Sequence, residues 1–163
     1  MRSEHDKHTT PHWCTRRMPV RDTRLAALME ECYRAELCAV ATYTYRSLIT
    51  EPYSRDISNT FDRIAVDESE HFRLIGSLMV SLGGDPIIST RLQIPPSDGE
   101  GIDCQSPARA LSRMLKSAMM EERREIDRYQ TLMGKTEDRI VRSFLSQIIA
   151  DEERHVSRLN ALM

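Results

Sequence analysis

The stretch DESEH (residues 67–71) decides the expected fold, because its pattern returns near the carboxyl end as DEERH (residues 151–155). Each copy places a glutamate and a histidine three residues apart, Glu68 with His71 and Glu152 with His155. On a helix, side chains at this spacing lie on one face, within reach of a single ion. The two stretches therefore predict two helices that each present a carboxylate and an imidazole together.

Both pairs interrupt an apolar helix face. Around each pair, apolar residues step by three and four positions, which is the period of a buried helix face. They are Ile57, Phe61, Ile64, Ile75, Leu78 and Leu82 in the first copy, and Val141, Leu145, Ile148, Leu159 and Leu162 in the second. Charged groups are costly to bury without a partner. A metal ion is therefore expected on this face.

The chain of 163 residues is expected to form a polar arm followed by one helical domain. Residues 1–21 are polar, contain two prolines and show no sustained period, so we predict a flexible arm there. Residues 22–163 are expected to form one four-helix bundle, with Thr136 as the cap of the last helix. The predicted helices span about residues 22–50, 54–82, 106–133 and 137–163.

Residues 85–105 are rich in proline and glycine and have no helical period. An extended segment of about 20 residues can span about 60–70 Å, whereas a helix of about 27 residues is only about 40 Å long. This segment is therefore expected to be a long crossover that returns to the opposite end of the bundle. Ser106-Pro107 is a strong helix start, with Ser106 as the expected cap. The second and third helices would then run parallel.

The first and third predicted helices each carry a glutamate in the middle of their apolar face, Glu36 and Glu122 respectively. A tyrosine follows seven residues later in each case, Tyr43 and Tyr129. The sequence thus contains two similar copies of one helical hairpin. We expect the tyrosines close to the site, either as hydrogen-bond or electron donors, or as core side chains with a partnered hydroxyl. Glu125 lies at the edge of the same face.

Four helices that supply Glu, Glu-x-x-His, Glu and Glu-x-x-His match a two-metal carboxylate site in a bundle core. Four buried glutamates would carry four negative charges, which two divalent ions cancel. Carboxylate and imidazole ligands suit iron or manganese better than a thiolate-seeking metal. The flanking Asp67, Glu70, Asp151 and Glu153 fall off the stripe and are expected to be solvated or to lie behind the ligands. The predicted metal ligands are Glu36, Glu68, His71, Glu122, Glu152 and His155.

Over about residues 22–162 the sequence resembles the ferritin-like superfamily, specifically its bacterioferritin and rubrerythrin branch. The six ligand positions match that branch in type, order and approximate spacing. The resemblance implies an all-α, ferritin-like four-helix bundle that holds two iron ions, with manganese as the alternative metal. It further implies that Glu68 and Glu152 bridge the two ions, and that each remaining glutamate and histidine completes one of them. The resemblance also implies a possible additional ligand, Glu125, which is similar in placement to an additional glutamate of rubrerythrins.

The sequence also departs from these relatives. Bacterioferritins have a haem-ligating methionine directly after the first bridging glutamate, where this chain has Ser69, so we expect no haem. The chain ends soon after the fourth helix, without the short fifth helix of ferritin cages, which disfavours a storage shell. A rubredoxin module, typical of rubrerythrins, is also missing from the sequence.

The resemblance implies a non-haem diiron oxidoreductase of peroxidase or ferroxidase type. Its buried dimetal centre would react with peroxide or dioxygen, reducing peroxide or oxidising ferrous iron, with an unidentified electron donor. Two alternatives stay open: a dimanganese, catalase-like enzyme, and an oligomeric iron-storage protein. A bundle that only mediates interactions would bind no stoichiometric metal. We expect a homodimer or a higher homo-oligomer.

Composition argues against several other classes of function. The 23 basic and 25 acidic residues give a net charge of −2, which does not favour nucleic acid or an anionic membrane. No apolar run approaches the roughly 20 residues of a membrane span, and the first residues given lack the apolar core expected of a secretory signal. The four cysteines form no CxxC pair, which argues against a disulfide framework. A cytoplasmic location is expected by elimination.

Overall fold

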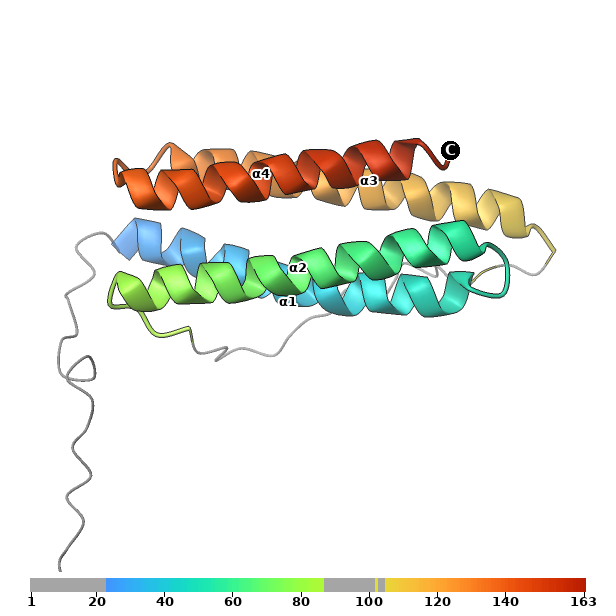
Figure 1. Ribbon diagram of the computed structural model, residues 1–163, viewed down its shortest axis with the longest axis horizontal. Coiled ribbons are helices and arrows are strands. Elements are labelled where there is room, and N and C mark those ends of the chain that lie inside the picture. Colours follow the sequence, from blue (N-terminus) through green and yellow to red (C-terminus); the bar gives the residue numbers. More distant parts are fainter. Residues whose placement is uncertain (1–22, 87–101, 103–104) are drawn as a thin grey trace, which may run out of the picture.

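A computed structural model of the protein describes residues 23–86, 102 and 105–163. These residues form four α-helices: α1 (Thr23–Thr50), α2 (Arg55–Ser81), α3 (Pro107–Met133) and α4 (Arg139–Asn160). Together the helices make an all-α, ferritin-like four-helix bundle (Figure 1), which confirms the predicted fold class. The predicted arm (residues 1–21) and most of the predicted crossover lie outside the described residues.

Two antiparallel hairpins make up the bundle. α1 packs against α2 and α3 packs against α4, while the hairpins meet through α1 with α3 and α2 with α4. The end of α2 and the start of α3 lie at opposite ends of the bundle (Figure 1), so these two helices run parallel. This direction confirms the geometric consequence expected of a long crossover.

The last helix begins later than the sequence suggested. Asp138 is the N-cap of α4, and its Oδ1 accepts hydrogen bonds from the backbone N–H groups of Ile140 and Val141. The predicted Thr136 cap was therefore wrong; its hydroxyl instead accepts from the N–H of Asp138 at 3.2 Å. Ser106 precedes α3 as expected but makes no side-chain capping hydrogen bond. Asp138 is the cap rather than Thr136 because it lies directly before the first helical residue, where its carboxylate accepts from two backbone N–H groups at once.

The apolar core consists of two clusters, one toward each end of the bundle. The cluster toward the start of α1 contains Met29, Cys32, Ile75, Leu78, Met79, Tyr129, Leu132, Val141, Leu145 and Ile148. The other contains Tyr43, Ile57, Phe61, Ile64, Ala65, Met114, Leu115, Ala118, Met119 and Leu159. On every helix the sequence between the two clusters carries buried charged residues. The apolar stripes predicted from the sequence therefore frame a polar centre.

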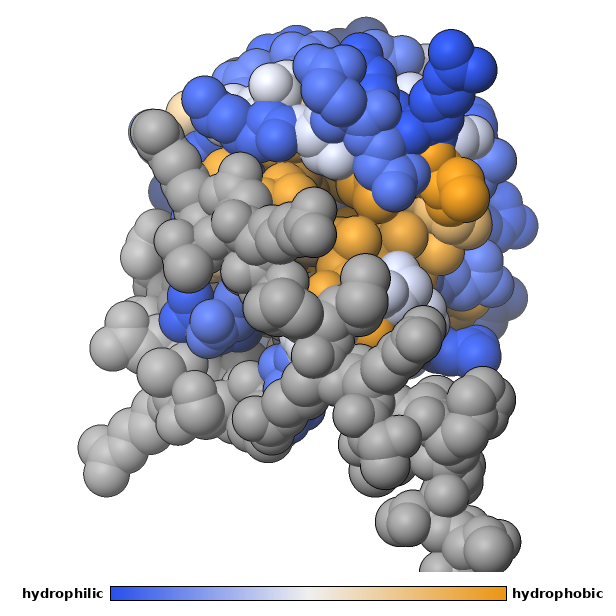
Figure 2. Space-filling view, turned by 90° about the vertical axis from the view of Figure 1, so that its left-hand side faces the viewer, coloured by the Kyte–Doolittle hydropathy of each residue, from blue (hydrophilic) through white to orange (hydrophobic). Residues whose placement is uncertain are grey.

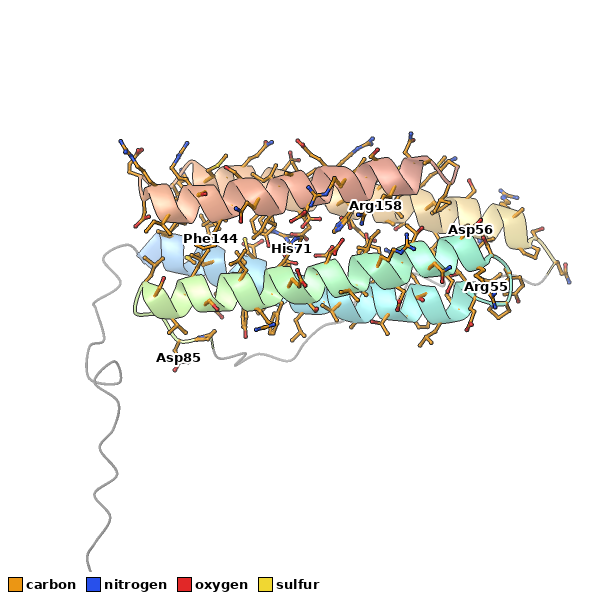
Figure 3. All side chains as sticks on the ribbon, viewed as in Figure 1. Arg55, Asp56, His71, Asp85, Phe144 and Arg158 are labelled. Atoms are coloured by element: carbon orange, nitrogen blue, oxygen red, sulfur yellow. The ribbon has the colours of Figure 1, made fainter. Side chains whose placement is uncertain are left out.

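The first apolar cluster extends to the end of the bundle where α1 begins. Leu25, Leu28, Leu82 and Phe144 pack against it there, and Figure 3 labels Phe144 at this end. Figure 2, which views this end, shows apolar surface framed by hydrophilic residues. None of the four described helices combines the length and apolar character that crossing a membrane requires.

Candidate metal centre

The structure brings all six predicted ligand residues together in the middle of the bundle. They form two clusters that share two members, and the donor atoms within each cluster lie within 4.8 Å of one another. His71, labelled in Figure 3, lies between the two hairpins. The first cluster is Glu36, Glu68, His71 and Glu152, and the second is Glu68, Glu122, Glu152 and His155.

In the first cluster the carboxylates surround Nδ1 of His71. This nitrogen lies 3.0 Å from Glu152 Oε1, 3.3 Å from Glu68 Oε2 and 3.7 Å from Glu36 Oε2. All four side chains are buried. Three carboxylate oxygens and one imidazole nitrogen thus point at a common position, as the ligands of one metal ion do.

The second cluster repeats this arrangement around Nδ1 of His155. The nitrogen lies 2.9 Å from Glu122 Oε2, 3.0 Å from Glu152 Oε2 and 3.4 Å from Glu68 Oε1. Glu68 and Glu152 therefore turn one oxygen toward each histidine. If each cluster held one ion, both of these carboxylates would contact both ions.

The other ring nitrogen of each histidine contacts an aspartate of the opposite hairpin. Nε2 of His71 lies 3.4 Å from Asp151 Oδ2, and Nε2 of His155 lies 3.1 Å from Asp67 Oδ2. A carboxylate at Nε2 holds the N–H there and leaves Nδ1 free to act as a ligand. The sequence left it open whether these aspartates are solvated; the structure places them behind the ligands.

An arginine of α4 holds each of these aspartates. Arg158 Nη1 donates to Asp67 Oδ2 at 3.1 Å, and Arg154 forms an ion pair with Asp151. Arg158 is labelled in Figure 3. In space, each histidine thus contacts an aspartate, and that aspartate contacts a partly exposed guanidinium. The guanidinium restricts the aspartate carboxylate to one orientation.

The two predicted tyrosines lie beside the clusters and cross from one hairpin to the other. Tyr129 of α3 donates its hydroxyl to Glu36 Oε1 of α1, and Tyr43 of α1 donates to Glu122 Oε1 of α3. Both rings are almost completely buried. Glu36 and Glu122 each belong to one cluster only, and we call them the terminal glutamates. A tyrosine therefore holds one oxygen of each terminal glutamate, and the other oxygen faces a histidine.

The carboxylates fit a pair of cations. Among the described residues, three buried side-chain oxygens have no hydrogen-bond partner: Glu36 Oε2, Glu68 Oε1 and Glu152 Oε1. All three face the position in front of a histidine Nδ1. A buried polar atom without a hydrogen bond is costly, and a divalent ion in each cluster would bind these oxygens. The residues present therefore fit two divalent metal ions.

In the metal-free protein, protons on the histidines and on some glutamates offset part of the negative charge of the two clusters. Burial by itself lowers the pKa of His71 and His155, but hydrogen bonds with the surrounding glutamates outweigh it and raise both to about 12. Burial raises the pKa of Glu36 and Glu122 well above the usual value. It acts in the same direction on Glu68, yet hydrogen bonds from the two histidines prevail and lower that pKa to about 2. Metal ions would have to displace the protons held here.

Glu125, the predicted additional ligand, belongs to neither cluster. Its carboxylate accepts a hydrogen bond from Arg128, which also lies 3.6 Å from Glu31. Burial raises the pKa of Glu125 to about 7, although the neighbouring guanidinium acts in the opposite direction. Glu125 would have to leave Arg128 before it could reach a metal ion.

A family model described as Rubrerythrin matches residues 27–163. The chain belongs to this family. None of the curated proteins with which the sequence was compared matches it. Among solved structures, this member of the rubrerythrin family is similar to a bacterioferritin-related protein from Bacteroides fragilis, described as a dodecameric thioferritin. The identity is 22%, the TM-score is 0.67, and the match covers 84% of this chain and 82% of that one.

A second solved structure similar to this rubrerythrin-family chain is Rhodobacter capsulatus bacterioferritin, described as having a metal-free dinuclear site and haem iron. The identity is 19% and the TM-score is 0.65, with 86% of this chain and 83% of that one covered. At these identities the two structures show a shared fold. Family membership together with the buried clusters makes this a protein with a carboxylate site that can hold metal.

Proposed function

We propose that this protein is a non-haem dimetal oxidoreductase of rubrerythrin type, which reacts with peroxide or dioxygen at its buried centre. The observation that carries the proposal is the pair of linked clusters, with two shared glutamates facing both histidines. A purely structural charge network would satisfy its own buried oxygens. Here three buried carboxylate oxygens that make no hydrogen bond face the two histidines, as expected of ligands that two cations would bind.

The chain's contribution is to supply and orient the ligands. Two iron ions bound here would provide the electrons that reduce peroxide or dioxygen. Tyr43 and Tyr129 hold one oxygen of each terminal glutamate, while Asp67 and Asp151 hold the two imidazoles in the tautomer that can bind metal. The proposed ligands are Glu36, Glu68, His71, Glu122, Glu152 and His155.

The apolar clusters on both sides keep water from reaching the centre along the bundle axis. Water exclusion strengthens electrostatic interactions and protects reactive species from side reactions. Glu125 is proposed as an additional ligand whose carboxylate would leave Arg128 and bind a metal ion instead. Because its pKa of about 7 lies close to neutrality, this carboxyl group can also gain or lose a proton under ordinary conditions.

Two related functions use the same residues. Manganese accepts the same donors as iron, and a dimanganese centre would disproportionate peroxide to dioxygen and water. An oligomeric iron store would use ferrous oxidation to deposit mineral; the similar fold from Bacteroides fragilis is described as dodecameric. We also propose a homodimer or a higher homo-oligomer for this chain, whose size separates an enzyme from a storage shell.

Metal analysis of protein purified without chelator tests the proposal. We expect about two iron ions per chain, rapid oxidation on adding peroxide after anaerobic ferrous loading, and loss of metal in the Glu68→Ala/Glu152→Ala variant. The matched control is Glu70→Ala/Glu153→Ala, which removes two exposed glutamates from the same two helices and should keep its metal.

Three results decide between the alternatives. Two manganese ions with dioxygen evolution would identify a catalase-like enzyme. A large shell that retains a mineral would identify a storage protein. If the purified protein holds no metal and takes up none from solution, the proposed dimetal function is overturned.

A further inference from the structure

The two hairpins repeat each other in sequence, but the repeat is broken at several places beside the centre. One of them is a buried arginine of α1. Corresponding residues of α1 and α3 lie 86 positions apart in the chain, as the pairs Glu36/Glu122 and Tyr43/Tyr129 show. By the same offset, Arg46 of α1 corresponds to Leu132 of α3. A buried arginine thus stands where the repeat has an ordinary core leucine.

Arg46 makes a contact that the other half of the repeat cannot make. Its guanidinium forms a bidentate ion pair with Glu121 of α3, with Nη1–Oε2 and Nη2–Oε1 distances of 2.6 and 2.9 Å. The counterpart of Glu121 in α1 is Ala35, so neither partner is repeated. The arginine is only 2% exposed. Glu121 is 33% exposed, so the pair is half-buried. Such a pair often stabilises a fold no more than apolar packing does, but it holds the Glu121 carboxylate in one orientation.

The ion pair lies beside one of the two tyrosine–glutamate hydrogen bonds. The guanidinium carbon of Arg46 lies 5.5 Å from the ring centroid of Tyr43, which donates to Glu122. Glu121 is the chain neighbour of Glu122 and is itself held by the Ser117 hydroxyl at 3.1 Å. Arg46 therefore ties α1 to α3 at the point where Tyr43 meets its glutamate, and restrains both partners.

The carboxylate oxygens lie closer to His155 than to His71, as expected if Arg46 restrains Glu122. Around His155, the three nearest carboxylate oxygens lie at 2.9, 3.0 and 3.4 Å. Around His71 the corresponding distances are 3.0, 3.3 and 3.7 Å. Both oxygens of Glu122 have a partner, whereas Glu36 Oε2 has none. The cluster beside the ion pair is thus the more completely organised one.

We propose that Arg46 is a positioning residue that makes the two metal positions unequal, so that the position of Glu122 and His155 binds its ion first and more tightly. The inference rests on the proposed function, because it requires two metal positions. Ligands that are already held in their binding geometry lose less freedom when the ion arrives. The position of Glu36 and His71 would fill second and would release its ion first.

Titration of the metal-free full-length protein with Co²⁺, followed by visible absorption and calorimetry, measures the two positions separately. We expect two binding steps whose affinities differ by about tenfold or more, the scale on which groups behind the ligands affect metal affinity. The variant Glu36→Ala should keep the tighter step. The variant Glu122→Ala should lose it.

The variant Arg46→Leu/Glu121→Ala makes the two halves alike at these two positions, because it introduces the residues found at their counterparts. It removes both charges together and so leaves no buried charge unpaired. We expect two Co²⁺ still to bind, with the tighter affinity reduced about tenfold toward the weaker one. A purely structural role would weaken both steps without changing their ratio. The matched control is Arg139→Leu/Glu137→Ala, which makes the same chemical changes at exposed positions near the start of α4.

Equal affinities in the unmodified protein would overturn the inference, as would an unchanged ratio in the double variant or a tight step that survives in Glu122→Ala. Should the double variant not fold, Arg46→Lys keeps the charge but loses the bidentate contact, and an unchanged affinity ratio in this variant would equally overturn the inference. Absence of any Co²⁺ binding would instead overturn the proposed dimetal function itself, so the two failures are distinct.

Discussion

Loading the metal-free protein with divalent ions should release protons, in a number set by the charges of the centre. At pH 7 both site histidines are protonated, because the surrounding glutamates raise their pKa to about 12. Glu68 is ionised, with its pKa lowered to about 2. The pKa of Glu36 and of Glu122 is raised by burial, so these carboxyl groups can hold protons as well.

The size of the effect follows from these protonation states. Each histidine must lose the Nδ1 proton to act as a ligand, which releases about two protons per chain, and the two terminal glutamates can add up to about two more. Occupation of both positions should therefore release about two to four protons. Protons are released rather than taken up, because the raised pKa values keep them bound at neutral pH until the metal ions displace them. The metal affinity should rise with pH, by about tenfold per unit for each proton released.

Calorimetric titration with Co²⁺ in buffers that differ in ionisation enthalpy, at one pH, measures this number directly. The Glu68→Ala/Glu152→Ala variant is the control, because it should bind no ion and release no proton. Release of fewer than about one proton per chain with both positions filled would show that the histidines are neutral without metal, and would refute the electrostatic reasoning.

Further predictions concern stability and the groups behind the ligands. The metal-free protein should lose stability as pH rises from about 6.5 toward 12, because protonation of histidines with raised pKa stabilises the folded state fully only below their ordinary pKa; urea unfolding across this range checks the sign. Asp151→Ala should weaken Co²⁺ binding by about 10–100-fold, whereas Glu153→Ala should not. Gly76→Ala should cost about 1–3 kcal/mol of unfolding free energy, since its Cβ would lie 2.9 Å from the Tyr33 ring. Asp138→Ala should cost about 1 kcal/mol through loss of the α4 cap, and an unchanged denaturation midpoint would contradict that assignment.

Much of the centre was predictable because its ligands share the period of their own helices. Glu68 and His71 lie three residues apart on one stripe, and a buried stripe in a bundle can only face the other helices. The grouping of the six residues into two clusters follows from aligning four such stripes. The cap of α4 was less predictable, since Thr136 and Asp138 are both good capping residues and only the path of the chain chooses between them.

The sequence by itself determined the helices, their apolar faces, the duplicated hairpin and the type of every proposed ligand, since each depends on spacing within a single helix. Only the tertiary structure decided which groups meet across the hairpins: Tyr43 with Glu122, His155 with Asp67, and Arg46 with the adjacent Glu121. Such pairings depend on the rotation and stagger of one helix against another. Packing of the whole core sets these two quantities, and no local pattern of residues records them.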